Sequence, residues 1–218
     1  KGIIKQKLSK MNCINDREVD EYIERVISTM SEDQLSELEQ LPYPYVVKIQ
    51  KKVKGLIAQH RFKVFDTWLE QDKISCLPNY ALPSVISPTV FTSMVPKSLY
   101  TAEEDMNEYE FKVVWALSEL GNVKWWHRNI SRLGFQINGP THAYPDIIVM
   151  LHSGKVLMVE TKGDYLDNDE SKEKARIGDQ WAKLAGKQYK YYMVFETKQP
   201  DYPGAYSLER FMEIVREI

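Results

Sequence analysis

The chain of 218 residues is 43% hydrophobic and 28% charged, a composition typical of one large or two small globular domains with ample core. Its formal net charge of −2 excludes a general attraction to polyanions, so any contact with nucleic acid has to come from a locally basic surface. No apolar run approaches the length that a membrane span requires.

The two cysteines and the first residues bear on the location of the protein. Cys13 and Cys76 are far apart in the sequence and lack the spacing of metal ligands, so we expect free thiols in a reducing, cytoplasmic compartment. The sequence starts at Lys1 with neither an initiating Met nor a signal peptide, which indicates a piece of a longer polypeptide.

Residues 1–96 are expected to form a mainly helical domain that links or bridges to other parts. Residues 1–15 show little periodicity, and Asp16 can then cap a helix with apolar residues at helical spacing up to residue 30. Ser31 with Gln34 predicts a capping box for a short helix, and a broad apolar face predicts a long helix over 45–70. Basic residues of that long helix fit either a solvated face or a stripe facing DNA: Lys48, Lys51, Lys52, Lys54, Arg61 and Lys63.

Residues 76–96 contain four prolines and several Ser and Thr, which predicts a linker before a second domain over 97–218. Thr101 with Glu104 predicts a capping box that opens a helix over 101–120, ended by Gly121.

The second domain then alternates short strands and helices. Strands are expected at 123–127, 134–137, 147–151, 156–159 and 191–195, and helices at 171–186 and 207–218. Helix, consecutive strands, helix and strand predict an α/β fold of the α+β, mixed-sheet kind, with a parallel crossover through the helix at 171–186.

The segment 144–163 carries the strongest local signal. Its two strands are apolar on both faces, as in the middle of a sheet covered by helices, yet the carboxylates of Asp146 and Glu160 stand at their outer ends. A three-residue hairpin loop with Gly154 in the left-handed conformation places Asp146 opposite Glu160, with Lys162 on the same face. A two-residue loop would place the carboxylates on opposite faces, unless a distortion near Pro145 restored the geometry.

Two carboxylates and an ammonium at this position have a chemical use. Paired carboxylate oxygens bind Mg²⁺, which retains several waters, and a nearby lysine can orient or help to deprotonate one of them. These groups suit metal-assisted hydrolysis of a phosphodiester.

Pro145-Asp146 followed by Glu160-Thr161-Lys162 resembles the signature of the PD-(D/E)XK nucleases. Over 97–218, and most specifically over 123–196, the chain resembles the C-terminal endonuclease region of the restriction (Res) subunits of type III restriction enzymes. The runs that carry this resemblance are W-W-H-R-N at 125–129, Y-P-D at 144–146 and E-T-K-G-D-Y-L-D-N at 160–168.

The resemblance implies a restriction-endonuclease-like αβββαβ core that hydrolyses double-stranded DNA. It implies Asp146, Glu160, Lys162 and Glu110 as catalytic residues. Asp146, Glu160, Glu110 and Thr161 would be ligands of Mg²⁺, with Mn²⁺ as a substitute. Glu108 is the alternative to Glu110, because an error of one turn exchanges the inward and outward faces of the helix; an ordinary surface glutamate is the other reading.

The resemblance also implies partners. They are double-stranded DNA, a modification (methyltransferase) subunit and a helicase-like motor domain upstream in the same polypeptide, with no membrane involved. The chain has no Walker-type phosphate loop, so ATP would act only through that motor.

Four residues are candidates for contact with nucleic acid because cations and aromatic faces are its usual partners: His127, Arg128, Trp126 and Lys174. Adjacent residues of a strand point in opposite directions, so at least one of Trp125 and Trp126 is expected in the core.

Three alternatives stay open. The chain could be another PD-(D/E)XK nuclease of repair or recombination, a non-catalytic DNA-binding or assembly module on the same fold, or a protein whose hairpin is merely joined by a salt bridge.

Overall fold

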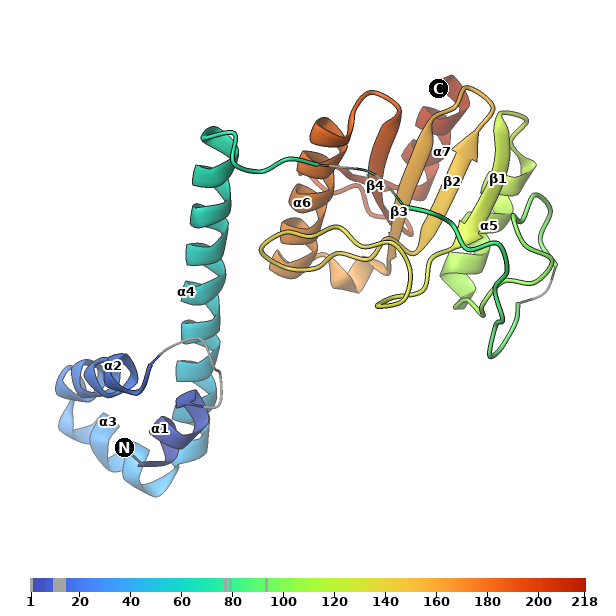
Figure 1. Ribbon diagram of the computed structural model, residues 1–218. Coiled ribbons are helices and arrows are strands. Elements are labelled where there is room, and N and C mark those ends of the chain that lie inside the picture. Colours follow the sequence, from blue (N-terminus) through green and yellow to red (C-terminus); the bar gives the residue numbers. More distant parts are fainter. Residues whose placement is uncertain (1, 10–14, 77, 79, 93) are drawn as a thin grey trace. The chain divides into compact units, whose positions relative to one another are not determined.

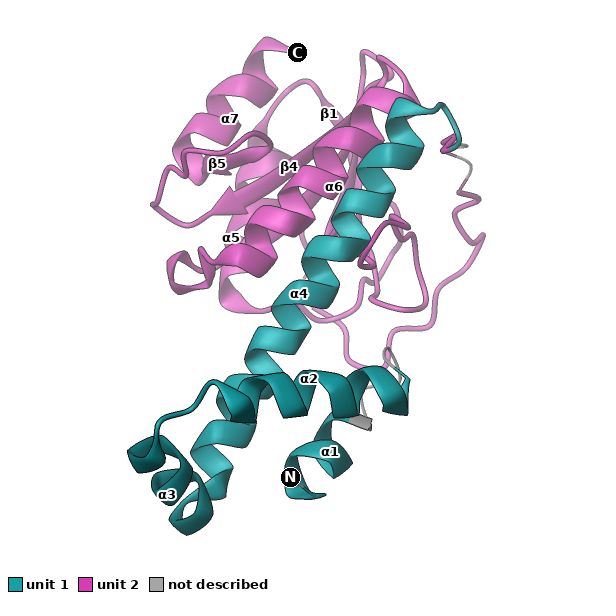
Figure 2. Ribbon diagram, turned by 90° about the vertical axis from the view of Figure 1, so that its left-hand side faces the viewer, with its two compact units in different colours: residues 1–73 teal, residues 74–218 magenta. Residues whose placement is uncertain are grey.

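A computed structural model describes residues 2–9, 15–76, 78, 80–92 and 94–218 of the chain (Figure 1). They divide into two compact units, residues 1–73 and 74–218 (Figure 2). The second unit begins before residue 97, the boundary expected from the sequence, because the proline-containing segment packs into it. The Tyr100 hydroxyl donates to the Pro83 carbonyl, and the Trp126 indole N–H donates to the Pro96 carbonyl. Cys76 is a free thiol, whereas Cys13 lies outside the described residues.

The first unit is helical, as predicted. Its helices are α1 (Gly2–Ser9), α2 (Asp16–Ser28), α3 (Glu32–Gln40) and α4 (Pro42–Glu70). Helix α1 has no counterpart in the prediction. Asn15, rather than Asp16, caps α2, and the Ser31 and Gln34 capping box of α3 is confirmed.

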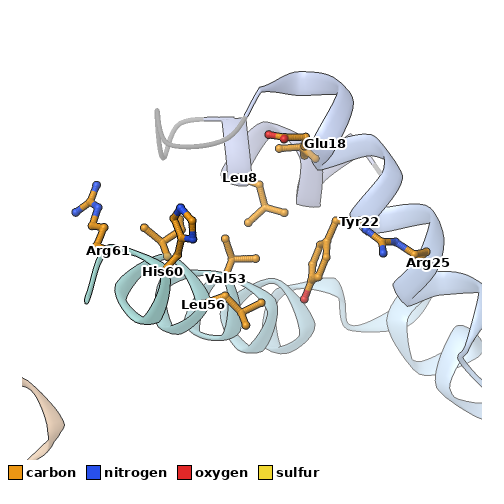
Figure 3. A pocket seen from close by; sticks show the side chains of 10 residues that line it. Leu8, Glu18, Tyr22, Arg25, Val53, Leu56, His60 and Arg61 are labelled. Atoms are coloured by element: carbon orange, nitrogen blue, oxygen red, sulfur yellow. The ribbon is translucent and has the colours of Figure 1, made fainter. Parts of the chain in front are cut away.

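Helices α1, α2 and α4 share a core that includes Leu8, Val19 and Val53. A pocket of about 540 Å³ opens beside it, and Figure 3 shows Leu8, Tyr22 and Val53 around this space. The basic residues named above on α4 are exposed, so a solvated face and a DNA-facing stripe both stay open.

The second unit is a mixed α/β structure. Its elements are α5 (Glu108–Glu119), β1 (Val123–Arg128), β2 (Ile147–Leu151), β3 (Val156–Lys162), the short 3-10 helix η1 (Asp164–Leu166), α6 (Asp169–Ala185), β4 (Tyr189–Phe195), β5 (Ala205–Ser207) and α7 (Leu208–Glu217). Over the described residues of this unit, the strands form one five-stranded sheet in the order β1-β2-β3-β4-β5. The pairs β1/β2 and β2/β3 are antiparallel, whereas β3/β4 and β4/β5 are parallel, so the expected parallel crossover through α6 is present.

Helices cover both faces of the sheet, which explains why its central strands are apolar on both sides. On one face, Val114 of α5 and Phe211 of α7 share a core with Val159 of β3. On the other face, Gly178 of α6 lies against the ring of Tyr191 on β4.

Two predicted elements are wrong. The helix expected from residue 101 begins at Glu108 instead, because Asn107 forms the capping box with Glu110. Glu104 accepts hydrogen bonds from the backbone N–H groups of Thr89 and Val90.

The strand expected at 134–137 is reduced to an isolated bridge between Ile137 and Ala143. The buried side chain of Asn129 binds both the N–H and the carbonyl of Phe135, and so supplies partners that a neighbouring strand would have given.

The outer edge of β1 is covered by residues 97–99. The Trp126 backbone N–H donates to the Lys97 carbonyl at 3.0 Å, and the Leu99 N–H donates to the Trp126 carbonyl at 2.8 Å. This short parallel contact is made by the first residues of the domain expected over 97–218, directly after the predicted linker.

Within the described residues, none of the helices has both the length and the apolar character needed to cross a membrane.

We predict that Gly178→Ala destabilises the second unit. A Cβ at residue 178 would lie 2.3 to 2.4 Å from atoms of the Tyr191 ring, so the ring or the helix must move. Overpacking of this kind usually costs about 1–3 kcal/mol of unfolding free energy. Urea unfolding followed by tryptophan fluorescence measures it. Gly121→Ala is the matched control, because a Cβ there meets nothing within 4 Å, and equal stability of the two variants would contradict the prediction.

Candidate functional site

The hairpin between β2 and β3 has the register that places two acidic residues side by side. Ile147 pairs with Val159, the last pair of the ladder before Asp146 and Glu160. The Asp146 N–H donates to the Val159 carbonyl, and the Asp146 carboxylate is close enough to raise the pKa of Glu160. The loop is residues 152–154, with Gly154 at φ +84° and the Leu151 N–H donating to the Lys155 carbonyl. This confirms the three-residue loop and excludes the two-residue alternative.

The side chain of Asp146 is held by neighbouring donors. Its Oδ2 accepts hydrogen bonds from the backbone N–H of Thr161 at 2.7 Å and from the Thr161 hydroxyl at 2.9 Å. Its Oδ1 lies 3.5 Å from Nη1 of Arg128, which also donates to the Asp146 carbonyl at 2.9 Å. These contacts fix the carboxylate at the end of β2.

Glu160 is the most deeply buried acid of the site, with 4% of its surface exposed. Its Oε1 accepts a hydrogen bond from Lys162 Nζ at 2.5 Å, whereas its Oε2 is buried without a partner. Burial raises the pKa of Glu160 to about 7, with a further contribution from the Asp146 charge, and Lys162 opposes the rise. The pKa of Lys162 is itself raised: burial lowers it, but the charges of Glu160 and Asp146 outweigh that effect.

Arg128 at the end of β1 connects Asp146 to a third acid, Glu110 of α5. Its Nη2 donates to Glu110 Oε1 at 3.0 Å, and the other oxygen of Glu110 accepts from the Asn107 backbone N–H at 3.0 Å. Burial raises the pKa of Glu110, and the Arg128 charge opposes this. Glu110 therefore faces inward, whereas Glu108 is exposed. Both carboxylate oxygens of Glu110 already accept hydrogen bonds. Its role as a metal ligand stays a prediction.

The donor set suits a hard divalent cation. Glu160 Oε2 is a buried oxygen that lacks a partner, which is costly, and the charge of the nearby Asp146 carboxylate acts on the same acid. Among the residues that the structure describes, no three His, Cys, Asp or Glu side chains gather as a metal cluster. Mg²⁺ commonly uses one or two carboxylates and keeps several waters, so Asp146 and Glu160 fit it.

Two of the four residues expected at nucleic acid belong to the core. Trp126 is fully buried, and His127 Nδ1 lies 2.8 Å from Oε2 of the buried Glu103. This burial corrects the prediction for both side chains, because neither reaches the surface. Arg128 retains partial exposure at 17%, and Lys174 at 25% lies on α6 near Glu160, where its charge lowers the pKa of that acid.

Sequence reasoning missed two residues near the site. Glu103 accepts hydrogen bonds from the Ser98 hydroxyl and the Arg128 backbone N–H, in addition to its His127 contact, and so anchors the end of β1. Tyr191 of β4 is buried on the face that carries Glu160. Strand alternation gave a usable signal for the tyrosine, since one of the adjacent Tyr191 and Tyr192 must point to that face.

Neither the known family models nor the curated proteins nor the solved structures contain a match to this chain.

We predict that Glu160→Gln flattens the pH dependence of stability in metal-free buffer. The folded protein holds the Glu160 proton more tightly than the unfolded chain, whose ordinary pKa is 4.5, so the wild type loses stability as the pH rises from 4.5 through about 7. The shift corresponds to about 3 kcal/mol of unfolding free energy.

Urea unfolding at pH 5 and pH 8 in the presence of EDTA measures this difference. Gln cannot ionise, so the Glu160→Gln variant should not lose this stability between pH 5 and pH 8. Glu108→Gln, at an exposed position, should lose it as the wild type does. A wild-type pH profile in Glu160→Gln would show that Glu160 is not the group responsible.

Proposed function

We propose that residues 97–218 act as the metal-dependent endonuclease domain of a type III restriction enzyme Res subunit and hydrolyse phosphodiester bonds of double-stranded DNA. The observation that carries the proposal is the meeting of Asp146, Glu160 and Lys162 at the ends of two buried antiparallel strands. Buried acids with strongly raised pKa values are candidates for functional roles. The order α5, β1, β2, β3, α6, β4 supports the PD-(D/E)XK resemblance of the sequence.

Asp146 and Glu160 would hold Mg²⁺, or Mn²⁺ in its place, with the Thr161 backbone as a further oxygen donor. The cation would supply Lewis acidity at the phosphate and a more acidic bound water. The side chains of the protein would orient the ligands and stabilise charge. Thr161 keeps Asp146 in one orientation through its two hydrogen bonds.

Lys162 has a separate role in the proposal. Its side chain is 14% exposed, and its ammonium remains charged because two carboxylates favour that form. A fixed positive charge beside the reacting phosphate orients the attacking water and stabilises negative charge that develops in the transition state. Arg128, at the same edge, would contact a DNA phosphate as a charge-assisted hydrogen-bond donor.

The proposal includes the wider setting implied by the resemblance. An upstream motor domain would use ATP, a modification subunit would recognise the DNA sequence, and the enzyme would work in the cytoplasm. A repair or recombination nuclease on the same fold remains the alternative enzyme, and it would cut according to DNA structure instead of a recognition site.

One observation favours a non-catalytic module as the second candidate. Arg128 already bridges Glu110 and Asp146, so a cation of the protein itself compensates part of the acidic charge. A domain that retained the fold for DNA binding or assembly would keep this pairing and need no metal.

We predict that Asp146→Ala and Glu160→Ala each reduce DNA cleavage to background in the complete enzyme, assembled with the modification subunit and supplied with ATP and Mg²⁺. Each change removes an oxygen anchor of the cation. Lys162→Ala should also abolish cleavage but leave metal binding largely intact, because lysine is not a ligand. Cleavage of plasmid DNA, ATP hydrolysis and Mn²⁺ binding are measured in parallel.

ATP hydrolysis should persist in all three variants, since the motor lies upstream. Glu108→Ala is the control at an exposed acid and should cleave normally. If the Asp146→Ala enzyme cuts DNA at the wild-type rate, the active-site assignment fails and the non-catalytic module replaces it.

A further inference from the structure

Among the residues that the structure describes, two buried side-chain polar atoms lack a hydrogen-bond partner. They are Glu160 Oε2 and the Tyr191 hydroxyl. Each such atom is costly to bury, so a pair of them calls for an explanation. The first atom belongs to the proposed metal site, whereas the second has no place in the mechanism above.

The sheet register makes these two residues neighbours. Tyr191 pairs with Met158 and Glu160 pairs with Met193 across the parallel strands β3 and β4. Side chains of paired residues point to the same face, so Tyr191 is a diagonal neighbour of Glu160, a separation that long side chains can span.

The electrostatics agree with this placement. Burial raises the pKa of Tyr191 well above its usual value, and the charges of Glu160 and Asp146 raise it further. The phenol therefore stays protonated throughout the neutral range and has a proton to donate to a ligand.

The ring of Tyr191 is also held in position. Gly178 of α6 packs so closely on it that a Cβ there would lie 2.3 Å from the nearest ring atom. A glycine at this point lets the helix press the ring against the sheet, so the ring is fixed before any ligand arrives. Supporting groups fixed in this way are typical of metal sites whose ligands are oriented by outer hydrogen bonds.

We propose that Tyr191 is a positioning residue of the metal site, whose hydroxyl donates a hydrogen bond to a water molecule carried by the cation beside Glu160 Oε2. This inference rests on the proposed function, since it assumes that Asp146 and Glu160 hold a divalent ion. It adds a third strand, β4, to a site otherwise built from β2 and β3.

The test is Tyr191→Phe in the 218-residue chain, with Mn²⁺ affinity measured by isothermal titration calorimetry. Loss of an outer hydrogen bond should weaken Mn²⁺ binding at least tenfold. The ring and its contact with Gly178 are retained, and an unpaired polar atom is removed, so the thermal midpoint of the metal-free protein should not fall.

Tyr192→Phe is the matched control. Tyr192 is the next residue of the same strand, similarly buried, but it points to the opposite face and packs on Phe211. The Tyr192→Phe variant should bind Mn²⁺ with an affinity within twofold of that of the wild type. A merely structural tyrosine would change the thermal midpoint and leave the affinity for Mn²⁺ unaltered.

Glu160→Gln distinguishes failure of the proposed metal site from failure of the proposed role of Tyr191. If wild type binds Mn²⁺, Glu160→Gln does not, and Tyr191→Phe binds as wild type, the inference about Tyr191 is overturned while the metal site stands. If Glu160→Gln binds Mn²⁺ as tightly as wild type, or wild type does not bind it, the proposed metal site fails and the role of Tyr191 fails with it.

Discussion

The burial of the Glu160 carboxylate at the end of a covered strand is the constraint on which the site depends. An acid in that place resists ionisation, and the pKa of about 7 records the resistance. Lys162 compensates one of its oxygens and leaves the other without a partner. A cation that binds near Glu160 would therefore favour loss of its proton. The neighbouring Asp146 raises the pKa of Glu160 and so enlarges the change in charge that a cation can cause.

The fold was predictable wherever one local pattern dominated. Gly154 and two β-branched runs determined the hairpin and its register. The capping of α5 was not predictable, because Thr101 with Glu104 and Asn107 with Glu110 have the same spacing. Burial of Glu103 against His127 draws residues 101–104 into irregular structure, and that contact joins residues 24 positions apart in the chain. The composition of residues 134–137 favours a strand, but the side chain of Asn129 takes up the backbone hydrogen bonds of Phe135 that a neighbouring strand would otherwise form.

The candidate site divides in the same way. Asp146, Glu160 and Lys162 could be placed from the sequence, since Asp146 directly precedes β2, the other two lie at the end of β3, and the two strands pair through a short loop. Trp126 was misassigned because residue type alone does not reveal which face of β1 is buried. Arg128 could be named from its neighbours, but its bridge to Glu110 depends on how α5 packs. Tyr191 carries no motif, and its relation to Glu160 exists only through the parallel pairing of β3 with β4.

The cover of residues 97–99 on β1 has a consequence for solubility. An open edge strand presents a row of unpaired N–H and carbonyl groups that can recruit a strand from another molecule. Here the backbone of Trp126 already has both partners in Lys97 and Leu99. Residues 97–99 thus protect this edge against pairing with a strand of another molecule. A fragment trimmed to start at Tyr100 would expose that edge and favour self-association.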